Sequence, residues 1–266
     1  LARAKKRSHW EAFQRALLFL LIWQKPRSIL LVKTCRYHVA VMIIWLRSLL
    51  FFVGMLIITP IFAMLVILMF PFSNIARCRM ASYWAHCALF WLKATCNLGF
   101  EVRGRDNIPN HPSIILCKHQ SAWETIALQV VFPPQIWVMK RELLYIPFLG
   151  WAWIALSAIP IDRSAGREAL KKLVTHGKDR LAKGLWVVIF PEGTRIAPGT
   201  RDKYHIGGAW LATHTQTTVV PVAHNAGLFW RKNAFIKTPG TITLSIGKPI
   251  ETADLKTDAL NQQVED

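Results

Sequence analysis

The uncharged run at residues 48–70 constrains this chain more than any other feature. It reads SLLFFVGMLIITPIFAMLVILMF and contains no Asp, Glu, Lys or Arg. At about 1.5 Å per residue, it is long enough to cross the roughly 30 Å of hydrocarbon in a bilayer. Pro60 also allows a bent helix that enters the membrane and returns. Because the run is long for a signal peptide and no small-residue cleavage site follows it, we expect a membrane anchor.

Positive charge is concentrated before this run. The net charge is +18, and residues 1–47 hold ten Lys/Arg against one Asp/Glu. A basic segment beside an apolar run suits an anionic lipid surface, where each cation contributes about 1 kcal/mol. Nucleic acid is the alternative partner for so basic a chain. We expect lipid and no nucleic acid, because the chain has no zinc-finger spacing, no RNP-like strand and no separate basic recognition helix.

The composition predicts four segments. Residues 1–40 form a basic extension, and we hypothesise that it includes upstream or non-native sequence, because Met42 could begin a shorter protein. Residues 41–98 form a membrane-anchoring helical segment, in which residues 80–98 have the spacing of an amphipathic helix lying on the bilayer or on the domain. Residues 99–250 form one α/β domain. Residues 251–266 form a polar tail that we expect to be frayed.

Short β-like runs alternate with helical runs along residues 99–250, which predicts an α/β fold with a mostly parallel central sheet. The expected strands are Ser113–Cys117, Ile136–Met139, Ala158–Ile161, Trp186–Phe190, Thr218–Val222 and Thr241–Ile246, and the expected helices lie near 123–132, 164–183 and 206–216. The five cysteines are odd in number and form no CxxC pair, so we expect reduced core thiols. The histidines outside the motif described next have no metal-ligand spacing, and no metal is predicted.

A histidine and a carboxylate follow the strand expected at Ser113–Cys117. They are His119 and Glu124 in the stretch Lys118-His119-Gln120-Ser121-Ala122-Trp123-Glu124. A carboxylate in the first helical turn can fix one imidazole nitrogen and leave the other basic toward a substrate hydroxyl. The alternative for such a pair is a helix-capping or core-satisfying role. We take the pair as a candidate general base and its orienting acid.

A second polar cluster, Phe190-Pro191-Glu192-Gly193-Thr194-Arg195, follows another expected strand. Ligands bind at the carboxyl ends of strands in open α/β sheets. Gly193 permits close backbone approach, Thr194 offers a hydroxyl, and Arg195 can form a bidentate pair with phosphate. The pattern indicates a site for a phosphate and a polyol, although a tight turn with a solvated arginine fits it as well.

In this order, the two clusters resemble the glycerolipid acyltransferase family, which has an HxxxxD loop followed by an FPEGTR block. Val138-Met139-Lys140-Arg141-Glu142-Leu143 is similar to the family's second block, and Val220-Pro221-Val222 to its fourth. The resemblance covers roughly residues 42–250. It implies a glycerolipid acyltransferase-type domain behind an N-terminal membrane-associated helical segment. Glu124 stands where the family has aspartate, and we expect activity to survive because the longer side chain keeps the charge and can still orient His119.

The resemblance implies direct transfer of an acyl chain from acyl-CoA or acyl carrier protein to the sn-2 hydroxyl of 1-acyl-sn-glycerol 3-phosphate. His119, oriented by Glu124, would take the hydroxyl proton, and no cofactor is implied. Glu192, Gly193, Thr194 and Arg195 would hold the glycerol phosphate. Lys140 and Arg163 are further candidates for a contact with the phosphate, although Arg163 could equally pair with Asp162. The candidates for the lining of an acyl tunnel are Trp123, Trp137, Trp151 and Trp153.

The resemblance also implies a bacterial inner-membrane location with the active site facing the cytoplasm. It leaves open an acyltransferase of the same fold that acts on glycerol 3-phosphate, another lysophospholipid or a lipid A precursor. A non-enzymatic membrane scaffold is a further alternative, because a fold does not by itself give a function. The sequence gives no oligomeric state.

Overall fold

A computed structural model describes residues 27–266, without the side chains of residues 27–37 and of Arg163. The chain divides into two units between Leu46 and Arg47, and the fold below is that of the second unit. Residues 1–26 lie outside the described part. The extension predicted at residues 1–40 therefore stays a prediction.

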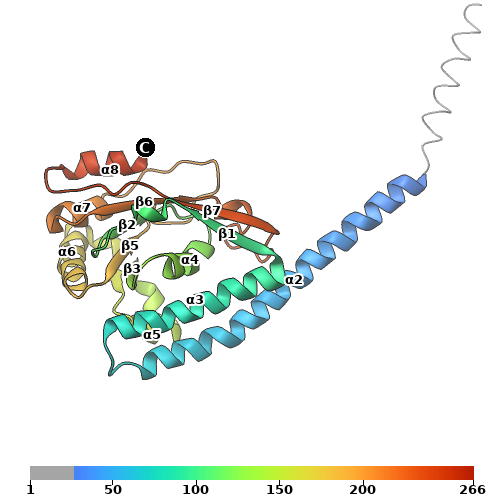
Figure 1. Cartoon of the computed structure of the whole chain (residues 1–266), viewed down its shortest axis with the longest axis horizontal. Coiled ribbons are helices and arrows are strands. Elements are labelled where there is room, and N and C mark those ends of the chain that lie inside the picture. Colours follow the sequence, from blue (N-terminus) through green and yellow to red (C-terminus); the bar gives the residue numbers. More distant parts are fainter. Residues whose placement is uncertain (1–26) are drawn as a thin grey trace, which may run out of the picture. The chain divides into compact units, whose positions relative to one another are not determined.

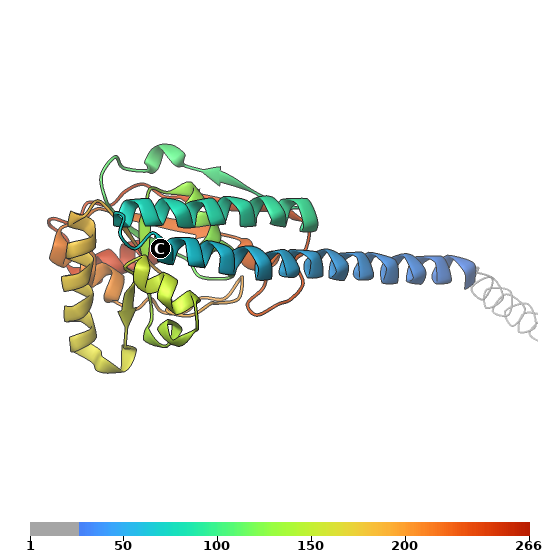
Figure 2. The same ribbon diagram turned by 90° about the horizontal axis from the view of Figure 1, so that it is seen from below.

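The predicted apolar helix belongs to a longer one, α2 (Arg27–Leu68), which continues through Pro60. Its segment His38–Leu68 contains an 18-residue stretch with a mean hydropathy of 2.7, and the segment is long and apolar enough to cross a membrane, by length and composition. Helix α3 (Asn74–Cys96) follows, and the hydroxyl of Ser73 caps its first turn by accepting from the backbone N–H of Ala76. The part of α2 from Arg47 onward lies alongside α3 in both views (Figures 1 and 2).

Close packing joins α2 to α3. The indole N–H of Trp91 donates to the carbonyl of Leu50 at 3.1 Å, and that of Trp84 donates to the hydroxyl of Thr59 at 3.1 Å. A Cβ at Gly54 would lie 2.0 Å from the indole nitrogen of Trp91, so only glycine permits this approach. One face of α3 is therefore packed inside the protein, as the buried side chain of Leu92 shows.

The described residues form a seven-stranded sheet of order β1-β7-β6-β2-β5-β3-β4, in which every pair except β6 with β7 is parallel. This confirms the predicted α/β fold with a mostly parallel sheet. The first strand was not predicted, because its exposed positions interrupt any apolar run. The strands are β1 (Leu98–Arg103), β2 (Ile114–Cys117), β3 (Gln135–Lys140), β4 (Ile159–Ile161), β5 (Trp186–Ile189), β6 (Val219–His224) and β7 (Gly240–Ile246).

Helices cover both faces of the sheet, so the central strands β2 and β5 are buried on two sides (Figure 1). Helices α2, α3 and α4 (Trp123–Val131) pack on one face, where side chains such as Ile115 and Val188 point. Helices α6 (Gly166–Ala182), α7 (Gly207–Thr215) and α8 (Thr257–Glu265) pack on the other, where Ile114 and Val187 point. Alternate residues of β2 and β5 therefore serve opposite cores, as expected for buried parallel strands.

Two expectations need correction. The polar tail is not frayed throughout, because it forms α8, whose Leu260 is fully buried and whose Asn261 donates to the carbonyl of Tyr204 at 3.3 Å. The cysteines are not all core thiols, because Cys87 is exposed on α3. The remaining described cysteines, Cys78, Cys96 and Cys117, are buried. Burial raises the pKa of Cys78 to about 12 and the pKa of Cys117 well above its ordinary value, so both are held as neutral thiols.

Candidate active site

Two loops meet at the carboxyl edge of the parallel sheet. The histidine loop (residues 118–122) follows β2, and the arginine loop (residues 190–196) follows β5. Strands β2 and β5 are neighbours with Ile114 opposite Val187 and Leu116 opposite Ile189, so both loops leave the sheet at the same level. This is the edge where open α/β sheets bind ligands. The sheet topology alone therefore brings the two predicted clusters together.

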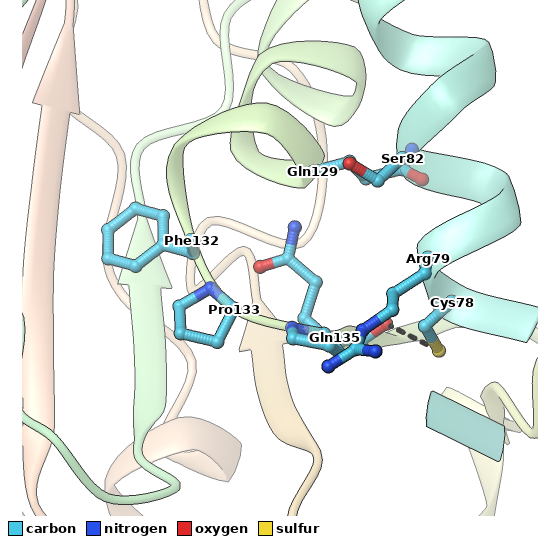
Figure 3. Close-up of a pocket in the computed structure, with 8 residues that line it drawn as sticks. Cys78, Arg79, Ser82, Gln129, Phe132, Pro133 and Gln135 are labelled. Atoms are coloured by element: carbon cyan, nitrogen blue, oxygen red, sulfur yellow. Dashed lines mark hydrogen bonds between the residues drawn. The ribbon is translucent and has the colours of Figure 1, made fainter. Parts of the chain in front are cut away.

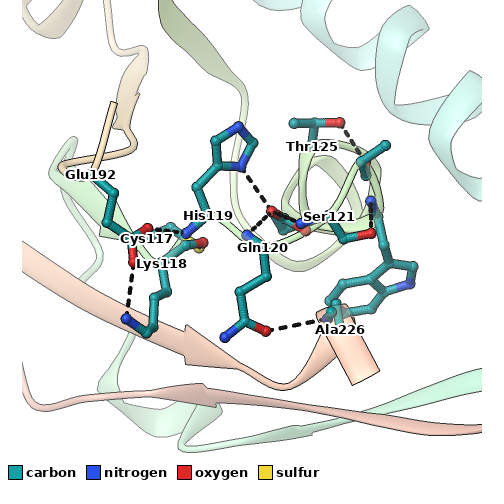
Figure 4. A network of polar contacts seen from close by, with 12 residues as sticks. Cys117, Lys118, His119, Gln120, Ser121, Thr125, Glu192 and Ala226 are labelled. Carbon is teal, nitrogen blue, oxygen red and sulfur yellow. Dashed lines mark hydrogen bonds and ion pairs between the residues drawn. The ribbon is translucent and has the colours of Figure 1, made fainter. Parts of the chain in front are cut away.

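Glu124 lies directly behind His119, as the sequence predicts. Its Oε1 accepts hydrogen bonds from His119 Nδ1 at 2.8 Å and from the backbone N–H groups of Gln120 and Ser121 at 2.7 Å each (Figure 4). A carboxylate only accepts, so the proton lies on Nδ1 and Nε2 is left as the basic nitrogen. The ring of His119 also stacks on Phe190, with centroids 3.9 Å apart. The imidazole is thus fixed in both tautomer and direction.

Glu124 stays ionised although it is buried. Burial raises the pKa of Glu124, but the hydrogen bond from His119, the electrostatic interactions with His224 and His119 and the hydrogen bond from Ser121 outweigh it, so the pKa of this carboxyl falls below its ordinary value. Ser121 is fully buried, and its hydroxyl accepts from the backbone N–H of Trp123 at 3.2 Å. Ser121 therefore braces the start of α4 and does not face a substrate.

The side chain of Glu192, which the sequence predicts to bind substrate, points instead toward the histidine loop. Its Oε1 accepts from Lys118 Nζ at 2.9 Å and its Oε2 from the backbone N–H of His119 at 2.6 Å (Figure 4). The side chain of Glu192 is fully buried, and Glu192 is not among the residues that line the cavity beside His119. Together with the bond from Ile196 N–H to the carbonyl of His119 at 2.8 Å, it ties the arginine loop to the histidine loop.

A cavity of about 750 Å³ opens beside His119. Four of the predicted substrate-binding residues line it together with His119, namely Lys140, Gly193, Thr194 and Arg195. Among the described residues, neither Lys140 nor Arg195 has an acidic partner within ion-pair distance. The cavity therefore combines one basic imidazole nitrogen with uncompensated cations, the arrangement needed to hold an anionic headgroup beside a general base.

Most of the rest of the cavity wall is apolar, although Thr125, His205 and Lys232 also line it. It includes Trp137 and Trp153, two of the tryptophans proposed for an acyl tunnel, whereas Trp123 is buried in the core and Trp151 is more than half exposed. Further apolar lining comes from Val138, Met139, Leu143, Leu149, Ile161, Leu170, Leu173, Ile189, Phe190 and Ile206. The side chain of Arg163 lies outside the described part of the structure, so its predicted phosphate contact stays a prediction.

Two residues near the site were not singled out by the sequence. His224, at the end of β6, is buried behind the histidine loop, with Nε2 2.8 Å from the carbonyl of Lys118 and 3.8 Å from Glu124 Oε2. Its Nδ1 accepts from the backbone N–H of Ala226 at 3.2 Å, so Nε2 carries the proton. Lys232 lines the cavity and donates to the hydroxyl of Thr194 at 3.3 Å. The position of His224 at the carboxyl end of a predicted strand could have indicated a role at the site, whereas Lys232 lies in an irregular loop without such a signal.

A second pocket, of about 80 Å³, lies at the opposite end of β3 (Figure 3). It is lined by Arg79, Ser82, Gln129 and Gln135 among others, and the buried amide of Gln135 has no hydrogen-bond partner among the described residues. Gln135 begins β3 and Lys140 ends it, so this pocket is separate from the cavity beside His119. The described residues contain no group of three His, Cys, Asp or Glu side chains placed to hold a metal ion.

Comparison with known proteins supports the resemblance seen in the sequence. Residues 99–225 match the family model described as Acyltransferase. The chain is 49% identical over 164 residues to the 1-acyl-sn-glycerol-3-phosphate acyltransferase of Pseudomonas aeruginosa, covering 62% of this chain and 64% of that protein. It is 31% identical over 188 residues to the protein of the same name from Saccharomyces cerevisiae, covering 68% of this chain and 61% of that protein.

The fold also matches a solved structure. The 1-acyl-sn-glycerophosphate acyltransferase of Thermotoga maritima superposes with a TM-score of 0.69 at 22% identity, covering 83% of this chain and 90% of that one. The aligned part of this chain spans slightly less than two thirds of the bacterial and yeast relatives. These similarities confirm the predicted resemblance to glycerolipid acyltransferases.

Proposed function

We propose that this chain is an acyltransferase like the proteins it matches, and that it transfers an acyl chain to the free sn-2 hydroxyl of 1-acyl-sn-glycerol 3-phosphate and so forms phosphatidic acid. The observation that carries the proposal is the single cavity that His119 and Arg195 share. A lysophosphatidate offers a hydroxyl, a phosphate and a long acyl chain. The cavity offers a base, uncompensated cations and an apolar wall, one for each of these groups.

His119 acts as the general base. Its Nε2 takes the proton of the acceptor hydroxyl while that oxygen attacks the thioester carbonyl of the acyl donor. The carbon–sulfur bond then breaks, and the proton passes from the imidazolium to the leaving thiolate, so that phosphatidic acid and a free thiol are the products. Such proton transfer contributes roughly 10²- to 10⁴-fold in rate. The step balances with these two substrates alone, and no further cofactor is part of the proposal.

Arg195 and Lys140 bind the phosphate of the acceptor, with Lys232 as a third cation that also holds Thr194. The guanidinium suits a bidentate contact with phosphate oxygens, and the ammonium groups add point charges. Gly193 has φ +67°, a left-handed conformation that favours glycine, and it keeps the turn before Arg195 free of a side chain. The arginine loop can therefore present Thr194 and Arg195 to a headgroup at close range.

Membrane association follows from the apolar helix α2 and from a substrate that lies in the leaflet. The donor is a soluble thioester, acyl-CoA or acyl carrier protein, and the proposed location is a bacterial inner membrane with the cavity open to the cytoplasm. The match to the Pseudomonas protein supports the bacterial setting. A donor in the cytoplasm requires that the histidine loop face that side.

Transfer of labelled acyl groups by the purified full chain tests the proposal. With lysophosphatidate as acceptor, wild type should form labelled phosphatidic acid, and His119→Ala should lose at least about 10²-fold in turnover. His176→Ala is the matched control, because His176 is an exposed histidine on α6, outside the cavity. Comparable turnover in His119→Ala would exclude the imidazole as the base.

A panel of acceptors in the same assay separates the related functions. Glycerol 3-phosphate, other lysophospholipids and a lipid A precursor test whether the cavity prefers a different alcohol. No transfer to any acceptor, with either thioester donor, would favour a non-enzymatic role and reject the proposal.

A further inference from the structure

An exposed apolar surface lies on the segment between β3 and β4. This segment contains a short 3₁₀ helix, η2 (Arg141–Tyr145), and helix α5 (Leu149–Ala155). Six large apolar side chains of this segment are between 40% and 71% exposed, and we call them the α5 patch: Leu143, Tyr145, Ile146, Phe148, Trp151 and Ile154. So many neighbouring exposed apolar groups indicate a surface that binds something.

The patch is fixed to the domain. On its inner side, α5 buries Ala152 and Ala155 in a cluster with Ala63 and Val66 of α2 and Ala81 of α3. Small residues at such a seam let helices approach closely. Because its inner side is packed in this way, α5 holds its outward side chains in a fixed direction away from the domain.

The connection before α5 is equally tight. A Cβ at Gly150 would lie 2.0 Å from the carbonyl oxygen of Leu144, so the 3₁₀ helix lies directly against α5. The rings of Phe148 and Trp151 contact each other edge-on at 5.3 Å. Phe148, directly before α5, and Trp151 of α5 therefore form one aromatic unit on the surface.

The patch continues the apolar surface of α2. Both views show α5 beside the C-terminal part of α2 (Figures 1 and 2), and the alanine seam joins the two helices there. Along α2, exposed side chains such as Leu56, Ile57 and Ile61 are more than half accessible. Because α2 is the helix that suits a membrane, its neighbour α5 presents aromatic and aliphatic groups at the same surface.

The patch also adjoins the cavity. Leu149 and Trp153 of α5 line the cavity, as does Leu143, which belongs to the patch itself. One short helix thus has one side on the cavity and another on the exterior. Lys140, which also lines the cavity, and Arg141 precede the patch. Arg141 lies 3.8 Å from Asp162 in a solvent-exposed pair, and a cation at this place suits the phosphate groups of a lipid surface.

We propose that the α5 patch inserts into the lipid leaflet beside α2 and forms the entrance through which the acyl chain of the lysolipid passes into the cavity. The occupant is a lipid leaflet and not a second protein, because the patch is continuous with the membrane helix and is preceded by cations. An amphipathic segment with aromatic residues is typical of such an interfacial position. The insertion into lipid is inferred from the exposed apolar surface alone, whereas the role as an entrance for the acyl chain rests on the proposed function.

Depth measurements test the insertion without any need for activity. In the full chain with Cys35 and Cys87 replaced by alanine, an environment-sensitive fluorophore is attached at Trp151→Cys or Phe148→Cys, and at Lys178→Cys as the exposed polar control on α6. In vesicles of phosphatidylethanolamine and phosphatidylglycerol, brominated lipids should quench the fluorophores at 148 and 151 and not the one at 178. Equal absence of quenching at all three positions would overturn the proposal, as would shielding that depends on protein density and not on lipid.

Kinetics test the entrance. Trp151→Ser with Ile154→Ser removes apolar surface outside the cavity lining, and the apparent KM for lysophosphatidate in vesicles should rise at least about tenfold. The KM for a short-chain lysophosphatidate dissolved as a monomer should stay within about twofold. An equal loss with both acceptors would reject the entrance. If wild type transferred no acyl group, the proposed function would fail, while the quenching result would still decide the insertion.

Discussion

The two sides of the cavity differ in how firmly the protein holds them. On one side, the histidine loop is fixed from three directions, by Glu124, by Glu192 and by His224. On the other side, Lys140 and Arg195 have no acidic partner among the described residues and reach the cavity from exposed or half-exposed positions. The group that moves a proton is thus preorganised, and the groups that bind a charge are left uncompensated.

The difference fits the two tasks. A general base must keep one tautomer and one direction, and hydrogen bonds made before the substrate arrives remove the cost of reorganisation. A phosphate-binding cation must keep its charge unsatisfied until the ligand supplies an anion, since an internal carboxylate would compete with it. Changes on the fixed side should therefore act mainly on kcat, and changes on the open side mainly on KM.

The largest effect is expected at Glu124. Glu124→Ala should lower kcat by about 10³-fold, because His119 loses the acceptor that fixes its tautomer and two backbone N–H groups lose their partner. Glu124→Asp should retain a rate within about tenfold of wild type. Steady-state kinetics with lysophosphatidate measure both, and an unchanged kcat in Glu124→Ala would remove this carboxylate from the mechanism.

A smaller effect, on binding, is expected at Arg195. Arg195→Ala should raise the KM for lysophosphatidate by roughly 10- to 100-fold, the size of one charged hydrogen-bonding contact, with kcat changed much less. Arg201→Ala is a suitable control, because Arg201 is exposed and does not line the cavity. A fall in kcat at constant KM would break the contrast between the two sides.

Glu192 should behave like the fixed side although it belongs to the arginine loop. Glu192→Gln removes the ion pair with Lys118 and weakens the bond to the backbone of His119, so kcat should fall about tenfold while the KM for lysophosphatidate stays nearly constant. Thermal unfolding of the same variant shows whether the fold is retained. A raised KM with normal kcat would instead return Glu192 to the substrate-binding residues.

The smallest expected effect concerns pH and His224. Burial lowers the pKa of His224 in the folded state below its ordinary value of 6.5, so below that pH the unfolded chain binds a proton that the folded chain does not. Stability should therefore fall as pH drops from 7.5 to 5.5, by up to about 1 kcal/mol from this group. Glu124 affects stability at more acidic pH. Its pKa in the folded state is lowered from 4.5, so the stability that its carboxylate contributes is lost as the pH falls below 4.5 and the carboxylate takes up a proton.

His224→Gln removes this titration while keeping a polar side chain. The difference in unfolding free energy between wild type and His224→Gln should therefore change between pH 7.5 and pH 5.5. A difference that is independent of pH would show that His224 does not remain neutral in the fold.

The sequence predicted the elements that carry long apolar runs or strong motifs. The strands behind His119 and Glu192 were found within a residue or two, because buried parallel strands are continuously apolar. Strand β1 was missed because half-buried and exposed residues interrupt its pattern, and α8 was missed because it buries mainly Leu260. Strand β1 and helix α8 each have too little continuous apolar sequence to be recognised locally.

The site was predicted by type but not residue by residue. His119 with Glu124 could be predicted because they lie only five residues apart, on the short loop after β2 and in the first turn of α4. The direction of Glu192 could not, because it depends on where β2 lies relative to β5, and residues 118 and 192 are far apart in sequence. The same holds for Lys232, whose position beside Thr194 depends on a loop without periodic structure.

The most direct test of the shared site removes the phosphate from the acceptor. Activity of wild type, His119→Ala and Arg195→Ala is compared with lysophosphatidate and with the corresponding monoacylglycerol, which has the hydroxyl and the acyl chain but no phosphate. The penalty of Arg195→Ala should disappear with monoacylglycerol, and the penalty of His119→Ala should remain with both acceptors. A penalty of Arg195→Ala that is the same for both acceptors would show that the arginine loop does not hold the phosphate of the molecule on which His119 acts.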